Sequence, residues 1–90
     1  MSIVVRFNPQ SLTAEQYDET IRRLRETGFP PEGLEMHVCF GDDGRLLVSE
    51  IWRTREQFEA FGERLMPVLA AAGISPGTPT IFEVHSLQIP

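Results

Sequence analysis

The same helix-start signal occurs twice in this chain, and it restricts the folds that the chain can adopt. Thr13-Ala-Glu-Gln16 and Thr54-Arg-Glu-Gln57 are both capping boxes, in which the threonine hydroxyl and the glutamine side chain satisfy each other's backbone N–H groups. Apolar residues follow each box at helical spacing: Ala14, Tyr17, Ile21 and Leu24 after the first, and Phe58, Phe61, Leu65, Val68 and Leu69 after the second. We therefore predict two amphipathic helices, the first ending at Gly28 and the second at Gly73.

Pro67 stands inside the second apolar stripe. Proline has no N–H to donate to the Glu63 carbonyl, and its ring crowds that carbonyl. The sequence therefore predicts a kink in the second helix, or a break followed by a short further segment.

Four segments read as β-strands because they are rich in β-branched residues or alternate between apolar and polar ones. They are Ser2–Phe7, Leu34–Phe40, Leu46–Trp52 and Thr80–Ile89. Asp43-Gly44 favours a type I′ hairpin between the middle two. The order β-α-β-β-α-β predicts an α+β, ferredoxin-like domain over residues 1–90, with two helices on one face of a four-stranded antiparallel sheet.

A two-residue hairpin loop fixes which residues oppose each other across the middle strands. His37 would lie opposite Glu50, Cys39 opposite Val48, and Glu35 opposite Trp52. We expect the helices to cover the alternate residues of the four strands, namely Ile3, Val5, Phe7, Met36, Val38, Phe40, Leu47, Ser49, Ile51, Phe82 and Val84.

The opposite face of the sheet would then mix charged and apolar side chains. Val4, Cys39, Val48, Ile81 and the only tryptophan would share it, which is more apolar area than a solvent-facing surface usually carries. A simply solvated face is the alternative. We expect a second copy to cover it in a two-fold homodimer, which would enclose a small-molecule cavity. That cavity would hold Arg6, His37, Glu50, Trp52, Glu83 and His85.

Composition excludes several classes of function. A net charge of -5 disfavours nucleic acid and membrane surfaces as partners. All eight basic residues are arginine, so Schiff-base chemistry and a phosphate-loop lysine are excluded. One cysteine and two histidines at scattered positions match no zinc site, and we expect neither metal nor cofactor. Arg6 and Pro9 interrupt the apolar core that a signal peptide needs, which indicates a cytoplasmic protein.

His37 and Glu50 are the predicted catalytic pair, because a carboxylate beside an imidazole orients it for proton transfer. A purely structural pair is the alternative. Trp52 is either a substrate wall or a core residue. Arg6 is either a structural partner of a carboxylate or an anchor for a substrate anion. His85 and Glu83 are weaker substrate-binding candidates on the last strand.

The segment from Glu50 through Trp52, Thr54 and Glu56 to Phe58 resembles the E-x-W-x-[ST]-x-E-x-F signature of the antibiotic biosynthesis monooxygenase-like superfamily of dimeric α+β barrels. That scaffold is shared by cofactor-free oxygenases, haem-degrading enzymes, isomerases and dehydratases. In the haem-degrading branch, an asparagine on the first strand, a tryptophan after the third strand and a histidine on the second helix form the site. Asn8 and Trp52 match the first two of these, whereas the second helix carries Phe58, Phe61 and Gly62 where the histidine would lie.

The resemblance and the His37–Glu50 pair together imply a cofactor-independent monooxygenase or isomerase that acts on a small aromatic or carbonyl compound. The alternative is a homodimer that binds a small molecule, or has a structural role, without turnover.

Overall fold

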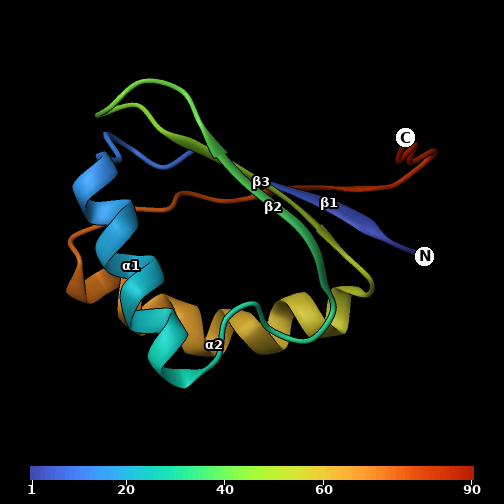
Figure 1. The fold of residues 1–90 in the computed structure, drawn as a ribbon, viewed down its shortest axis with the longest axis horizontal. Coiled ribbons are helices and arrows are strands. Elements are labelled where there is room, and N and C mark those ends of the chain that lie inside the picture. The colour runs from blue at the N-terminus through green and yellow to red at the C-terminus, as the bar shows by residue number, and fades with distance from the viewer.

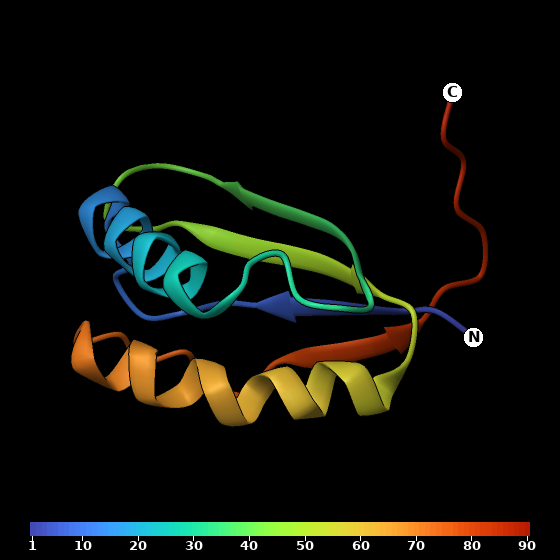
Figure 2. The same cartoon turned by 60° about the horizontal axis from the view of Figure 1, so that its bottom comes forward.

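The computed structural model describes residues 1–90 and has the predicted order of elements. These are β1 (Ile3–Phe7), α1 (Ala14–Thr27), β2 (Leu34–Phe40), β3 (Leu47–Trp52), α2 (Arg55–Ala71) and β4 (Thr80–Glu83) (Figure 1). The strands form one antiparallel sheet in the order β2-β3-β1-β4. Both helices lie on the same side of it (Figure 2). The predicted ferredoxin-like fold is therefore confirmed.

Both helices begin at the predicted threonines. Thr13 accepts from the Gln16 N–H at 3.0 Å, and Gln16 Oε1 accepts from the Thr13 N–H at 3.0 Å, which completes the capping box. Thr54 accepts from the Gln57 N–H at 3.1 Å, but the Gln57 side chain does not bond the Thr54 N–H, so the predicted second capping box is only half formed. The Asp43 carboxylate, in the β2–β3 hairpin, also accepts from the Ala14 N–H at 2.8 Å. The hairpin is thereby fastened to the start of α1.

The helix α2 runs without interruption through Pro67, so the predicted break into two segments is wrong. Proline removes only one intrahelical hydrogen bond. Leu65, before Pro67, packs against the core cluster that includes β1 and β3 residues, and Leu69, after it, packs with Leu12 and Ile74, so both halves of the helix are held in the core. The helix ends at Ala71, and the Ala72 N–H bonds to the Val68 carbonyl at 3.1 Å.

The hairpin register is as predicted. His37 pairs with Glu50 and Cys39 with Val48, and the Arg45 N–H donates to the Asp42 carbonyl at 2.8 Å. The turn is not type I′, because Gly44 has a positive φ of 87° while Asp43 does not. An irregularity at Glu35 also places Leu34, rather than Glu35, opposite Trp52.

The helix-covered face of β2 and β3 is the reverse of the predicted one. His37, Glu50 and Trp52 lie beneath the helices, whereas Met36, Val38 and Phe40 point outward and are 42%, 40% and 37% exposed. The strand β1 has Ile3 and Val5 buried, as predicted. The error arose because both faces of β2 carry apolar residues, so alternation alone does not identify the covered one.

The last strand is shorter than predicted and shows its other face to the helices. It ends at Glu83, and after the Val84 N–H bonds the Ser2 carbonyl at 2.9 Å the chain leads away from the body (Figure 2). Ile81 pairs with Val5 and packs against the core, while Phe82 is 63% exposed. The predictions for Ile81 and Phe82 were therefore inverted.

The core lies between the sheet and the helices in two clusters. The larger contains Ile3, Val5, Leu24, Trp52 and Phe61, and the smaller contains Leu12, Leu69 and Ile74. Between these clusters the packing leaves the space described next.

Candidate functional site

Four side chains form a continuous chain of hydrogen bonds beneath the helices. Trp52 Nε1 donates to Glu50 Oε1 at 2.9 Å. Glu50 Oε2 lies 2.6 Å from His37 Nδ1, and His37 Nε2 lies 2.7 Å from the Tyr17 hydroxyl. The structure thus brings together three predicted site residues and adds Tyr17.

The direction of these bonds follows from the donors available. An ionised Glu50 can only accept, so His37 donates through Nδ1. In the neutral imidazole, Nε2 is then the unprotonated nitrogen and accepts from the Tyr17 hydroxyl. The outcome is an oriented imidazole with a basic nitrogen on the side away from the carboxylate, as a general base requires.

The segment from Glu50 to Phe58, which carries the family resemblance, positions these side chains through its local structure. Glu50 and Trp52 are two residues apart on β3, so both side chains point to the same face and can bond each other. Thr54 then starts α2, which brings Phe58 and Phe61 against the indole ring with centroid distances of 5.8 and 5.5 Å. Trp52 is fully buried and does not line the cavity, so its place is in the core, holding Glu50.

Aromatic rings fix the plane of His37. The Tyr17 ring is stacked on it at 5.9 Å between centroids, and the Phe29 ring meets it edge-on at 5.6 Å. Tyr17 was predicted only as part of the apolar stripe of α1. That stripe faces the sheet, so the position of Tyr17 was foreseeable, but its contact with His37 depended on the covered face of β2.

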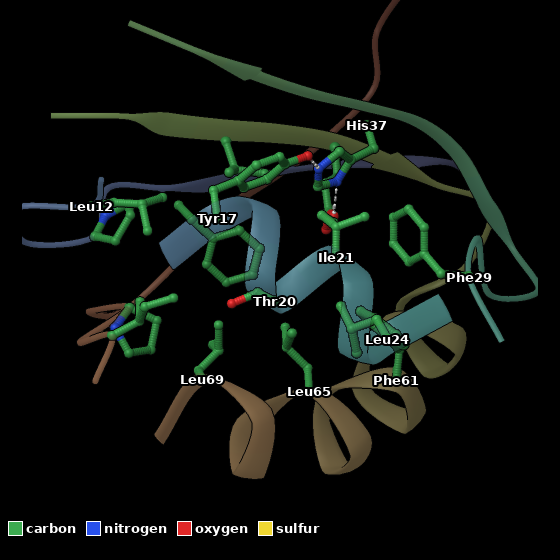
Figure 3. A pocket seen from close by; sticks show the side chains of 16 residues that line it. Leu12, Tyr17, Thr20, Ile21, Leu24, Phe29, His37, Phe61, Leu65 and Leu69 are labelled. Atoms are coloured by element: carbon green, nitrogen blue, oxygen red, sulfur yellow. Dashed lines mark hydrogen bonds and ion pairs between the residues drawn. The ribbon is translucent and has the colours of Figure 1, made fainter. Parts of the chain in front are cut away.

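The hydrogen-bonded chain opens onto a cavity of about 70 Å³ between the helices and the sheet (Figure 3). Sixteen residues line it, of which 11 are hydrophobic. Tyr17, His37 and Glu50 supply its polar end, while the Thr20 hydroxyl is engaged by the Gln16 carbonyl at 2.9 Å. No buried side-chain polar atom lacks a partner. A ligand therefore meets an apolar chamber with a single hydrogen-bonding locus.

The electrostatics of the cavity are anionic. Glu50 is its only carboxylate, and no arginine lines it. Burial, followed by the nearby Cys39 and Glu50, raises the pKa of Tyr17 to about 12, so its hydroxyl remains a donor at neutral pH. Burial and the charge of Asp18 raise the pKa of the Cys39 thiol. These surroundings favour a neutral ligand over a carboxylate.

The remaining predicted residues lie elsewhere, so the predicted site residues do not line one common cavity. Arg6 and Asn8 are exposed and line a separate cleft with Thr78 and Thr80. The Arg6 guanidinium lies 5.9 Å from the centroid of the Phe40 ring, on the outer face of the sheet. Glu83 and His85 are exposed at the end of β4 and in the segment after it. The reversal of the β2 and β3 face places Arg6 on the opposite side of the sheet from His37, whereas Glu83 and His85 are remote because they lie at and beyond the exposed end of β4.

No group of three or more histidine, cysteine, aspartate or glutamate side chains is arranged to hold a metal ion. None of the helices has the length and apolar character needed to cross a membrane.

Comparison of the fold with solved structures finds proteins of similar architecture. A candidate antibiotic biosynthesis monooxygenase from Deinococcus radiodurans superimposes with a TM-score of 0.63 at 16% identity, covering 100% of this chain and 99% of that one. SnoaB, a cofactor-independent oxygenase from Streptomyces nogalater, gives 0.65 at 14% identity and 96% and 93% coverage. A candidate monooxygenase of the same type from Chloroflexus aurantiacus gives 0.58 at 17% identity and 99% and 97% coverage.

Neither a protein-family profile nor a curated protein matches the chain in sequence. At these identities the structural likeness shows the fold. The chain thus has the fold of the antibiotic biosynthesis monooxygenase-like proteins, and the resemblance carried by the Glu50 to Phe58 segment is confirmed at that level.

Proposed function

We propose that this protein is a cofactor-independent enzyme that removes a proton from a small, neutral aromatic or carbonyl compound in the helix–sheet cavity. His37 Nε2 is the base, and Glu50 orients the imidazole and balances the charge that it gains. The observation that carries the proposal is the Glu50–His37–Tyr17 chain of hydrogen bonds, which ends in an otherwise apolar cavity.

The dry surroundings of His37 support this role. The side chain of Glu50 is 5% exposed and that of His37 is 17% exposed, so their charges are little screened by water. A proton moved from substrate to His37 forms an imidazolium next to a fixed carboxylate, which stabilises the charge as it develops.

Two products can follow from the deprotonated substrate. Return of the proton to a different carbon gives an isomer, with no net redox change. Reaction with dioxygen converts a substrate CH₂ group into C=O and releases one water, so the substrate supplies all the electrons and no reductant is consumed. SnoaB, which shares the fold, is a cofactor-independent oxygenase, and this favours the second fate.

Deuterium exchange tests the shared first step. The protein is incubated in D₂O at neutral pH with 2-tetralone, a ketone with acidic hydrogens beside the carbonyl, and incorporation is followed by mass spectrometry. We expect the wild type to accelerate exchange. The acceleration by His37→Gln should be at least tenfold smaller than that by the wild type. His85→Gln is the matched control, because His85 is exposed and remote from the cavity, and it should retain full activity.

Exchange that is equal in wild type and His37→Gln would refute the assignment of the base. Binding of 2-tetralone without any exchange would identify a binding protein instead. Oxygen uptake in parallel separates the two product fates, since only the monooxygenase consumes dioxygen.

We also propose that two copies associate through the outer face of the sheet. Met36, Val38, Phe40 and Phe82 lie there and are between 37% and 63% exposed. Val4 and Ile51 lie on the same outer face, because Val4 pairs with Phe82 of β4 on one side and with Ile51 of β3 on the other. A contiguous apolar surface of this kind on a small domain favours a homodimer.

A further inference from the structure

The hydroxyl of Tyr17 is hydrogen-bonded to His37 Nε2, the nitrogen that acts as the base in the proposed chemistry. His37 Nε2 has a single lone pair, and the Tyr17 hydroxyl lies 2.7 Å from it. A substrate hydroxyl or an acidic C–H cannot approach that nitrogen while the phenol is in place. Resting and substrate-bound states must therefore differ at Tyr17.

The size of the cavity leads to the same requirement. Its volume of about 70 Å³ is well below the ~150 Å³ of an apolar cavity that takes up a benzene ring. Some part of the lining has to move before even one ring enters. Leu24 and Phe61 are 2% and 5% exposed and packed into the core, whereas Tyr17 is only half-buried on α1. Among the half-buried lining residues, Tyr17 is the one bonded to His37 Nε2, so its outward movement would both enlarge the cavity and free that nitrogen.

We propose that Tyr17 is a displaceable internal ligand of His37, a latch that a substrate hydroxyl or enol replaces on Nε2. The inference rests on the proposed role of Nε2 as the base. Displacement costs one hydrogen bond, which a ligand O–H restores by donating to the same nitrogen, and the outward swing of the phenol enlarges the cavity. A ligand that offers this nitrogen neither an O–H nor an acidic C–H loses the Tyr17 hydrogen bond and gains nothing in return, so the latch selects compounds that carry an acidic proton.

The latch lowers the apparent affinity for ligand in proportion to the fraction of molecules that are open. Removing only the Tyr17 hydroxyl should remove that penalty and leave the ring in place. Tyr17→Phe is therefore expected to bind p-cresol roughly tenfold more tightly than the wild type, as the loss of one competing hydrogen bond implies. Thr27→Val is the matched control, because the Thr27 hydroxyl lies on the same helix and bonds the Leu24 carbonyl at 3.3 Å but does not line the cavity, and its p-cresol affinity should be unchanged.

A measurement on the wild-type protein covers the case in which Tyr17→Phe folds poorly. Tyr17 is the only tyrosine, so ¹³Cζ-labelled tyrosine gives one NMR signal for the latch itself. Saturation with p-cresol at pH 7, where both phenols are protonated, should move that signal toward the chemical shift of a solvated phenol.

The latch is overturned if p-cresol saturates the protein without moving the Tyr17 signal, or if Tyr17→Phe binds p-cresol equally or more weakly. These outcomes are separable from failure of the proposed function. If p-cresol displaces Tyr17 but 2-tetralone shows no exchange, the latch is present and the proposed chemistry is absent. If 2-tetralone exchanges while p-cresol leaves the Tyr17 signal unmoved, the chemistry is present and the latch is absent.

Discussion

His37 and Glu50 face each other across β2 and β3, with Nδ1 of the imidazole 2.6 Å from Oε2 of the carboxylate, beneath the helices. The second carboxylate oxygen accepts from the Trp52 indole at 2.9 Å, so Glu50 is held at both ends. A buried acid fixed in this way determines which nitrogen of His37 carries the proton. The chemistry of the site therefore depends on Glu50 as much as on His37.

Glu50→Gln should inactivate the site while preserving its shape. Trp52 can only donate, so the amide oxygen must face the indole and the NH₂ group must face His37. Nδ1 then has to accept, and the proton moves to Nε2, which no longer takes a proton from a substrate. We expect a loss of at least tenfold in 2-tetralone exchange, and a decrease of about 1–3 kcal/mol in the free energy of unfolding.

The change of tautomer can be observed directly by ¹⁵N NMR of the His37 ring. Glu83→Gln serves as the control, because Glu83 is exposed on β4 and should affect neither the tautomer nor the exchange rate. An unchanged His37 tautomer in Glu50→Gln would contradict the proposed hydrogen-bond directions.

The pairing of His37 with Glu50 was predictable because local chemistry fixes it. The Asp43-Gly44 turn sets the register of the hairpin, and register determines every opposed pair. The helix starts at Thr13 and Thr54 were equally accessible, since each cap is satisfied within four residues.

The face of the hairpin was not predictable in the same way. Met36, Val38 and Phe40 form an apolar row, and a monomer would normally bury them in preference to His37. The actual choice depends on two non-local facts: Glu50 and Tyr17 satisfy both ring nitrogens, and the apolar row remains available for another molecule. Neither can be read from the periodicity of one strand.

Val38→Glu should disrupt the proposed homodimer. Val38 is 40% exposed on the outer face, near the centre of the edge strand β2, and a carboxylate there would be buried without a partner if two sheets packed together. Analytical ultracentrifugation at micromolar concentration should show a dimer for the wild type and a monomer for Val38→Glu. Ala60→Glu, at an exposed position of α2, should remain dimeric. A wild-type monomer at that concentration would refute the dimer.

The cavity should discriminate by ligand charge. Glu50 is the only carboxylate in the lining and no arginine offsets it, so an anionic ligand is repelled where a neutral one is not. Isothermal titration calorimetry should give an affinity for p-cresol at least tenfold higher than for 4-methylbenzoate at pH 7. In Glu50→Gln this preference should shrink, because the repelling charge is removed. Equal affinities in the wild type would place the binding site elsewhere, with the Arg6 cleft as the next position to test.

Stability at high pH should depend on Tyr17. Burial raises its folded-state pKa to about 12 from an unfolded value of 10.0, so its contribution is fully present below pH 10 and is lost as pH rises from 10 to 12, where the unfolded chain releases the phenolic proton first. The chain has no lysine, which leaves this window almost free of other titrations, and a Cys39→Ala background removes the thiol, whose pKa is also raised. Urea unfolding at pH 9 and pH 11 should therefore show a loss of stability with Tyr17 that is largely absent in Tyr17→Phe. Parallel losses in both proteins would mean that the phenol is as well solvated in the folded state as in the unfolded one, in conflict with its position against His37.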